Sequence, residues 1–161
     1  MQSPPGAMTR LNMAIQIASG MTYRHRRGVF HCDFSCRNIF LIKPWTVKIG
    51  DFGGSKLDDQ APFGAEEVRY ELPLREREWE QHSYDKRELF VLGCAIYETV
   101  AWEKPFAQFG ETEVEENYAR EVFPDTKGIL AGKVIYGCWK EQFDSAEDVV
   151  AALEEEQSMV P

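Results

Sequence analysis

The sequence predicts a mainly α-helical domain with a small β-patch in its first third. Three observations predict this class: apolar residues recur at helical spacing over several long segments, three short β-type runs lie between residues 29 and 49, and no internal repeat or linker divides the chain. With 161 residues, of which 43% are apolar, the chain is long enough to bury a core without disulfides or a structural metal.

The first half of the chain predicts a helix, then short strands, then a long loop. The helix is expected over residues 9–26, with Thr9 as a candidate N-cap and Gly28 beyond its end. Its last turn carries the basic run 24–27, which is expected to face the C-terminal helix dipole. Strands are expected at residues 29–31, 39–42 and 47–49. Residues 51–84 show no clear period, and a loop of that length in a compact domain is usually functional.

The second half predicts helices only. Residues 86–102 are apolar on nearly every face, which favours a helix buried on most sides. Further helices are expected over about 112–121, 126–137 and 145–157. Asp144 or Ser145 opens the last of these, with Glu147 and Asp148 placed for a capping box.

Charge and cysteine usage exclude several functional classes. The 18 Lys and Arg against 27 Asp and Glu give a net charge of −9, which makes nucleic acid and anionic membrane surfaces poor partners. We expect no signal peptide and no membrane span, because the apolar stretches are too short or wrongly flanked. The scattered cysteines indicate reduced thiols and an intracellular protein of the cytoplasm or nucleus. A zinc site is disfavoured, since such sites usually repeat a tight cysteine pair; its candidate ligands are Cys32, Cys36, His25 and His31.

Polar side chains concentrate where the β-patch meets the long loop. The block His31-Cys32-Asp33-Phe34-Ser35-Cys36-Arg37-Asn38 is followed, thirteen residues after its end, by Asp51-Phe52-Gly53. Carboxylate and amide oxygens suit Mg²⁺, which keeps waters or phosphate oxygens in its shell. The pattern therefore indicates a phosphate-handling site. Taken singly, each block could instead be a turn whose Asp or Asn bonds its own backbone.

The joint spacing removes that alternative. The first block resembles the protein-kinase catalytic loop and the second resembles the D-F-G metal motif. The resemblance covers essentially the whole chain and implies the C-terminal lobe of a eukaryotic-type protein kinase domain, a partial domain over 1–161. Its expected parts are the helix at 9–26, the catalytic loop and short strands at 29–50, the activation segment at 51–74 and the helical subdomain at 85–157.

The resemblance implies a role for each site residue, with ATP and Mg²⁺ as cofactors and a protein as substrate. Asp33 would accept or orient the proton of the substrate hydroxyl, and Arg37 would supply positive charge near the transferred phosphoryl group. Asn38 and Asp51 would hold Mg²⁺, and Phe40 would lie under the adenine ring. Supporting roles are implied for His31, Phe52, Gly53 and Glu88. An Arg directly before Asn38 is the tyrosine-kinase-like pattern, but a single residue there does not fix the acceptor.

The chain also departs from the family pattern. Cys32 replaces the usual Arg before the catalytic Asp, which makes the loop non-RD. The A-P-E motif is Leu72-Pro73-Leu74, so the Glu that pairs with an Arg near the last helix is absent, and the stretch after Trp139 has no such Arg. Glu88 replaces the usual Asp that anchors the catalytic loop, with an arm one methylene longer.

The largest departure lies upstream of Asp33, where the sequence has no Lys and no glycine-rich loop. The phosphate-anchoring residues of an N-terminal lobe are therefore not in this chain, and we expect it to be inactive alone. An open cleft face would expose Phe40 and Phe52 to an N-terminal lobe or another protein partner.

Three interpretations remain open. The intact base and metal set favours a truncated protein kinase that transfers phosphoryl groups in a longer chain. Cys32, Leu74 and Glu88 favour a catalytically dead kinase-like binding or regulatory module, a pseudokinase. A small-molecule phosphotransferase of the aminoglycoside or choline kinase type shares the catalytic spacing, but the complete D-F-G motif and Gly93 argue against it.

Overall fold

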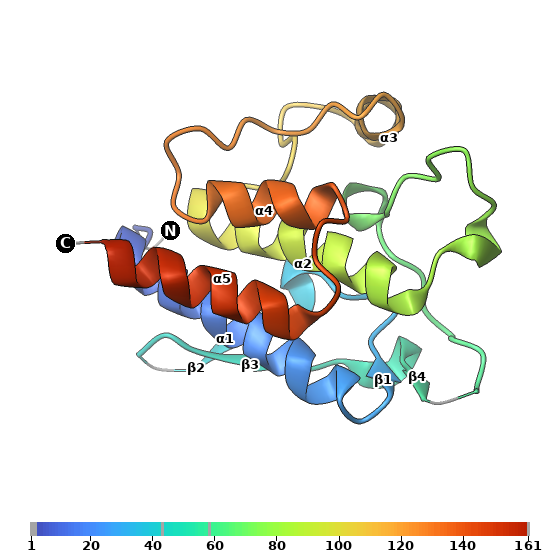
Figure 1. Ribbon diagram of the computed structural model, residues 1–161, viewed down its shortest axis with the longest axis horizontal. Coiled ribbons are helices and arrows are strands. Elements are labelled where there is room, and N and C mark those ends of the chain that lie inside the picture. The colour runs from blue at the N-terminus through green and yellow to red at the C-terminus, as the bar shows by residue number, and fades with distance from the viewer. Residues whose placement is uncertain (1–2, 43, 58, 161) are drawn as a thin grey trace.

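The chain folds around one long buried helix, with the other helices arranged about it (Figure 1). The computed structural model describes residues 3–42, 44–57 and 59–160. The central helix is α2, Tyr84–Ala101, and the Ser83 side chain caps it by accepting a hydrogen bond from the Lys86 amide. Most of α2 is buried, which confirms the prediction from its all-round apolar pattern.

Helix α1, Ala7–His25, packs against α2 and α5 through one buried stripe. The stripe has helical spacing and consists of Leu11, Ala14, Ile17, Ala18 and Met21. Gly6, and not Thr9, precedes the first turn, and its carbonyl accepts a bond from the Arg10 amide at 3.1 Å. The helix is therefore predicted correctly in kind, but its N-cap was wrongly assigned.

The C-terminal half contains α3, Glu111–Ala119, α4, Gly132–Trp139, and α5, Ala146–Met159. The helix expected at 126–137 begins only at Gly132, because Ala131 before it adopts a left-handed conformation with φ 62°. A Cβ at Gly132 would lie 2.4 Å from the Thr126 carbonyl oxygen, so the preceding loop folds directly onto the helix start. Ser145 caps α5 as predicted, accepting from the Asp148 amide at 3.1 Å.

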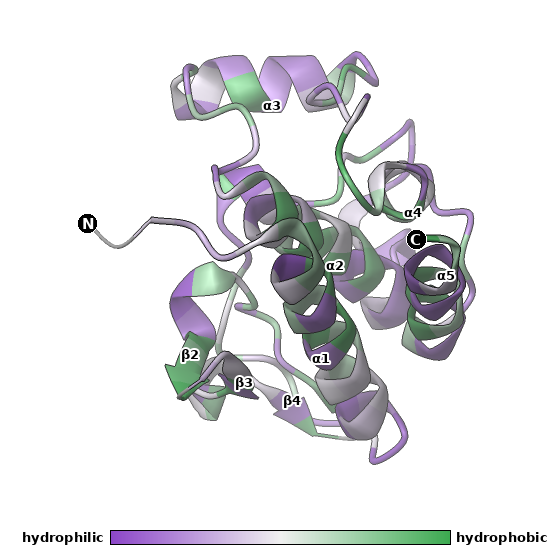
Figure 2. Cartoon of the chain, turned by 90° about the vertical axis from the view of Figure 1, so that its left-hand side faces the viewer, coloured by the Kyte–Doolittle hydropathy of each residue, from purple (hydrophilic) through white to green (hydrophobic). Residues whose placement is uncertain are grey.

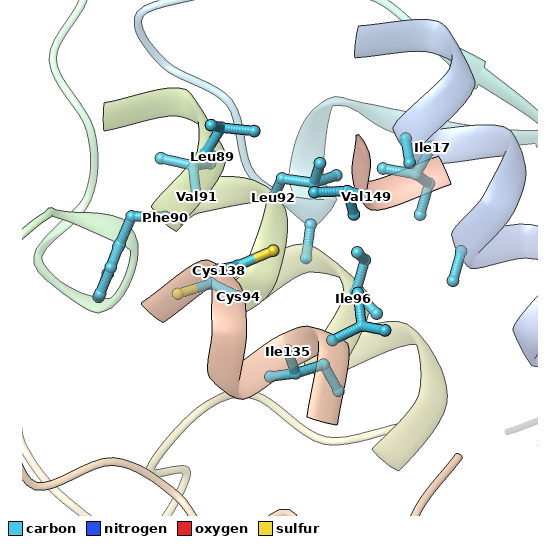
Figure 3. Close-up of a cluster of buried hydrophobic side chains, with 14 of the residues drawn as sticks. Ile17, Leu89, Phe90, Val91, Leu92, Cys94, Ile96, Ile135, Cys138 and Val149 are labelled. Atoms are coloured by element: carbon cyan, nitrogen blue, oxygen red, sulfur yellow. The ribbon is translucent and has the colours of Figure 1, made fainter. Parts of the chain in front are cut away.

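Close packing of α2 on α4 depends on Gly93. A Cβ at this position would lie 2.6 Å from the Cβ of Cys138, so a larger residue would force the helices apart. Figure 3 shows the buried side chains at this contact, with Cys94 and Cys138 close together and Ile135 beside them. All four cysteines are free, and burial raises the pKa of the Cys94 thiol to about 12.

The strands form short antiparallel pairs. Strand β1, Val29–Phe30, pairs with β4, Lys56–Leu57, and β2, Ile39–Ile42, pairs with β3, Thr46–Ile49. The sequence did not predict β4, which lies inside the expected loop. The β1–β4 pair holds the start of that segment beside the chain that enters the polar block at His31.

The rest of the 51–84 segment contains short helical turns that the sequence did not predict. They are η2, Phe52–Gly54, η3, Val68–Tyr70, and η4, Trp79–Gln81. Within the described residues, none of the helices combines the length and the apolar character that crossing a bilayer requires.

Candidate functional site

The two polar blocks found in the sequence lie side by side. The His31 ring Nε2 donates a hydrogen bond to the Gly50 carbonyl at 2.9 Å, and the Gly50 amide donates to the Asn38 carbonyl at 3.0 Å. Both bonds involve the residue directly before Asp51. One bond from a side chain and one between backbone groups therefore fix the start of the second block against both ends of the first.

Asn38 and Asp33 are joined within the first block. Ser35 caps the turn η1, Cys36–Asn38, and the Asn38 side chain points inward, with only 6% of its surface exposed. Its Nδ2 donates to the Asp33 carbonyl at 2.7 Å. The Asn38 Oδ1 accepts no hydrogen bond from the described residues, so this oxygen is free to bind a metal ion.

The Asp33 carboxylate is partly open to solvent and faces Arg37. Its Oδ1 lies 3.7 Å from the Arg37 Nη2, and Arg37 Nε lies 2.8 Å from Glu67 Oε1. Arg37 is 60% exposed, so both ion pairs are weak and solvent-screened. The shorter of the two contacts, to Glu67, orients the Arg37 side chain toward the predicted activation segment.

Asp51 opens the second block in a strained conformation. Its φ is 55°, in the left-handed region that few non-glycine residues adopt. The side chain is exposed, and none of the described residues donates a hydrogen bond to its carboxylate. Phe52 is 45% exposed, and its ring centroid lies 5.2 Å from that of His31. A Cβ at Gly53 would meet nothing closer than the Asp51 Oδ1 at 3.6 Å, so packing does not require glycine there.

The oxygen donors at this site fit Mg²⁺. An amide oxygen from Asn38 and a carboxylate from Asp51 are hard ligands, and Mg²⁺ takes its remaining ligands from water and phosphate. The described residues contain no group of three or more His, Cys, Asp or Glu placed to hold a metal ion, and this includes the zinc candidates Cys32, Cys36, His25 and His31.

Glu88, on the buried helix α2, anchors the start of the first block. The side chain is 1% exposed, and its Oε1 accepts hydrogen bonds from the His31 amide and, at 3.0 Å, from the Cys32 amide. Its Oε2 lies 2.7 Å from the His25 Nε2. Burial would raise the pKa of Glu88, but the His25 hydrogen bond and the Arg24 charge outweigh it and hold the pKa below its usual range. The hydrogen bonds to the His31 and Cys32 amides show that Glu88, with its longer side chain, still reaches the backbone of the loop.

Phe40 lies on β2 and is 53% exposed. Its ring covers Gly50, where a Cβ would come within 2.7 Å of the ring. This contact links Phe40 to the residue that precedes Asp51.

A protein-family comparison decides the identity of this arrangement. The family model described as protein tyrosine and serine/threonine kinase matches residues 2–147. The chain belongs to the protein kinase family. Its mainly helical fold with a small β-patch is that of a kinase C-terminal lobe.

Curated relatives support the same family. Over 100 residues, 61% of this chain and 20% of the relative, it is 36% identical to serine/threonine-protein kinase Nek3 of Mus musculus. It is 26% identical over 145 residues to serine/threonine-protein kinase CTR1 of Arabidopsis thaliana, covering 83% of this chain and 17% of the relative. With serine/threonine/tyrosine-protein kinase HT1 of Arabidopsis thaliana the identity is 29% over 160 residues, 91% of this chain and 40% of the relative. The kinase chain thus spans about a fifth of the length of the first two relatives.

An ion-pair network that the sequence did not predict follows the predicted activation segment 51–74. It differs from the family's usual pair, whose Glu the sequence lacks. Arg75, one residue after Leu74, contacts Glu141 and, through its Nε at 2.6 Å, Glu121. Arg77 Nη2 adds a contact to Glu141 at 2.7 Å. The cations here come from the residues directly after the predicted activation segment, and the carboxylates come from later in the chain.

Sequence reasoning also missed two residues around the kinase catalytic loop. The basic run 24–27 was expected to face the C-terminal dipole of its helix, yet Arg24 is only 5% exposed and lies against Glu88. Glu67, which holds Arg37, lies in the segment that showed no period. The basic run gave no signal that one of its members is buried, because α1 turns that position toward the catalytic loop.

Proposed function

We propose that this chain supplies the catalytic lobe for ATP-dependent transfer of a phosphoryl group to a protein hydroxyl. The observation that carries the proposal is a pair of hydrogen bonds at Gly50, one from the His31 ring and one to the Asn38 carbonyl, since they hold the block that contains Asp33 and Asn38 beside the residue that precedes Asp51. The free cysteines and the composition support an intracellular location, in the cytoplasm or nucleus.

Each site residue has a role in this proposal. The partly exposed Asp33 carboxylate would accept or orient the proton of the incoming hydroxyl, and Arg37 would place positive charge beside the transferred group. Asn38 and Asp51 would hold Mg²⁺, which neutralises phosphate charge when bound. Phe40 would support the adenine ring. Supporting contacts would come from His31, Phe52, Gly53 and Glu88.

Within these 161 residues the nucleotide would be held from one side only. The sequence before Asp33 contains no Lys and no glycine-rich loop. Phosphoryl transfer depends almost entirely on positioning and charge stabilisation, so we propose that the chain is inactive by itself. The exposed side chains of Phe40, Leu41 and Ile42 would then be covered by an N-terminal lobe or a protein partner.

The first prediction concerns nucleotide binding. Asp51→Asn should weaken Mg²⁺-dependent ATP binding about tenfold or more, because a metal-held phosphate loses its anionic ligand. The measurement is a thermal-shift titration, in which ligand at a hundredfold over its Kd adds about 2.7 kcal/mol to the stability of the unaltered chain. Asp59→Asn, the same change in an exposed turn of the same segment, is the matched control and should bind as the unaltered chain does.

Two outcomes contradict the proposal. An unaltered chain with no Mg²⁺-ATP shift would remove the nucleotide role. Rapid turnover by the isolated chain that disappears on Asp33→Asn would contradict the statement that it is inactive alone.

A second candidate is a nucleotide-independent binding module. One observation favours it: three consecutive apolar side chains of β2 are about half exposed, which is typical of a surface that another protein covers. The same titration separates the two candidates, because a binding module of this kind gives no shift with Mg²⁺-ATP.

A further inference from the structure

Arg24 is a buried cation in the last turn of α1. Its side chain is 6% exposed, and none of its three guanidinium nitrogens has a hydrogen-bond partner among the described residues. Its nearest charge is the Glu88 Oε2, 3.8 Å from its Nη1. Burial lowers the pKa of Arg24, and the neighbouring Glu88 opposes this only in part.

Stability alone does not account for a charge at this position. A buried ion pair loses much of its Coulomb energy to desolvation, and replacement by apolar groups of similar size is often neutral or stabilising. Glu88 is already held without Arg24, since its oxygens accept from the His31 and Cys32 amides and contact His25. Glu88 therefore keeps these partners when Arg24 is replaced, and the loss of stability is limited to that of the Arg24 charge beside it.

What Arg24 contacts is specific to the site. Its guanidinium carbon lies 5.2 Å from the ring centroid of Phe34, in the catalytic loop, and 5.8 Å from that of Phe52, in the metal motif. The His31 ring touches the same two rings, at 5.5 and 5.2 Å. Arg24 and His31 thus each contact both Phe52 and Phe34 of the catalytic loop.

Phe52 needs such contacts. It is half-exposed, and it follows Asp51, whose left-handed backbone is costly unless the surroundings hold it. Among the described residues, the ring contacts of Phe52 are those with His31 and Arg24. Releasing one of them would let the start of the activation segment move.

We propose that Arg24 is a positioning residue: its buried guanidinium joins the Phe52 ring to the catalytic loop anchored by Glu88, and so fixes the orientation of Asp51. The inference rests on the proposed function in one respect, because that function makes Asp51 a metal ligand. The mechanical part, that Arg24 orders the metal motif, stands on the contacts alone.

The test compares Arg24→Met with Arg27→Met by peptide-resolved hydrogen exchange. Arg27 has the same chemistry on the same helix end, since its guanidinium carbon lies 3.6 Å from the ring centroid of Tyr23, but it contacts neither loop of the site. In Arg24→Met, backbone amides of residues 50–57 should exchange about three- to tenfold faster, while those of α5 stay unchanged. Arg27→Met should leave both regions unchanged.

A ¹⁹F chemical shift adds a measurement that does not depend on the overall stability of the fold. In protein labelled with 4-fluorophenylalanine, the ¹⁹F resonance of Phe52, assigned by its loss in Phe52→Leu, should shift in Arg24→Met and stay in place in Arg27→Met. Arg24→Lys keeps a cation beside Glu88 without a planar face and should shift the same resonance.

The outcomes that overturn the proposal are distinct. Unchanged exchange over residues 50–57 in a folded Arg24→Met chain would refute it. Failure of Arg24→Met to fold would refute it too, because the side chain would then serve stability. Affinity for Mg²⁺-ATP should fall about tenfold in Arg24→Met at a temperature where both chains are fully folded. If the unaltered chain binds no Mg²⁺-ATP, the proposed function fails, while the exchange and ¹⁹F measurements still decide the role of Arg24.

Discussion

At the scale of single residues, Glu66 in the activation segment has the most unusual surroundings for a carboxylate. It lies partly buried near Arg87 and Glu88. Burial raises the pKa of Glu66 to about 7; the Arg87 charge and a bond to its own backbone oppose this, and Glu88 adds to it. The folded state therefore binds this proton more tightly than the unfolded chain does.

That difference makes the stability depend on pH. The contribution of protonated Glu66 is complete below the usual pKa of 4.5 and is lost as the pH rises through about 7. Glu66→Gln, which stays neutral, should therefore be more stable than the unaltered chain by about 1–2 kcal/mol at pH 8, with no difference near pH 4. Urea unfolding at both pH values measures this. Glu76→Gln, at an exposed position, should show no such change, and an equal gain from it would contradict the prediction.

Residue chemistry explains which side chains the sequence could single out as candidates. His31, Asp33, Asn38 and Asp51 stand in two blocks whose joint spacing resembles the catalytic motifs of protein kinases, and their roles stay predictions that rest on this resemblance. Arg24 and Glu67 act through contacts that only the fold creates, because α1 turns Arg24 inward and the activation segment brings Glu67 back to Arg37. No local pattern distinguishes such residues from solvated charges.

At the scale of elements, the chain directly after the predicted activation segment is held by ion pairs to carboxylates in the turns that follow α3 and α4. Arg75 is 17% exposed and Glu141 is 15% exposed, so their ion pair is shielded from solvent. Arg75 also donates to the Trp139 carbonyl at the end of α4. Burial alone would raise the pKa of Glu121 and Glu141, but hydrogen bonds from Lys140, Arg75 and Arg77 outweigh it and hold both values below the usual range.

Arg75→Met should therefore destabilise the fold by about 1–2 kcal/mol at pH 7, because two carboxylates lose a partner. Stability depends on pH here with the opposite sign to that predicted for Glu66. Groups with a lowered pKa contribute stability above their usual pKa and lose it as the pH falls. The difference in stability between Arg75→Met and the unaltered chain should therefore disappear in acid. Thermal unfolding from pH 7 to pH 3 measures this.

The matched control for Arg75 is Arg26→Met, which breaks an ion pair with Glu147 in which both side chains are 62% exposed. Exposed pairs contribute little, so this variant should cost less than about 0.5 kcal/mol. Equal losses from the two variants would show that burial of the Arg75 network has no effect.

The elements themselves were predicted unevenly. Long periodic segments gave α1 and α2, because burial of one face or of all faces imposes a pattern over many residues. Strand β4 has two residues and cannot show a period. The start of α4 was misplaced because the left-handed Ala131 is a tertiary feature, and its apolar neighbours continue the helical pattern on both sides of it.

At the scale of the whole molecule, the apolar surface is unevenly covered. Figure 2 shows β2 as a hydrophobic strand at the edge of the molecule, away from α4 and α5. Phe40, Leu41 and Ile42 are 53, 48 and 52% exposed, and because successive side chains of a strand point to opposite faces, neither face of β2 is fully covered. Contiguous apolar surface of this kind promotes association.

Leu41→Lys should therefore reduce self-association of the isolated chain about tenfold, since a charge in the middle of β2 opposes burial of its neighbours. Its cost to stability should be small because Leu41 is already half-exposed. Sedimentation velocity over a range of concentrations gives the association constant. Met159→Lys is the matched control: Met159 is 69% exposed near the end of α5, outside the β2 surface, and its replacement should leave association unchanged. If both lysine variants weakened association equally, net charge and not the β2 surface would govern it, and the covering partner inferred for this face would lose its support.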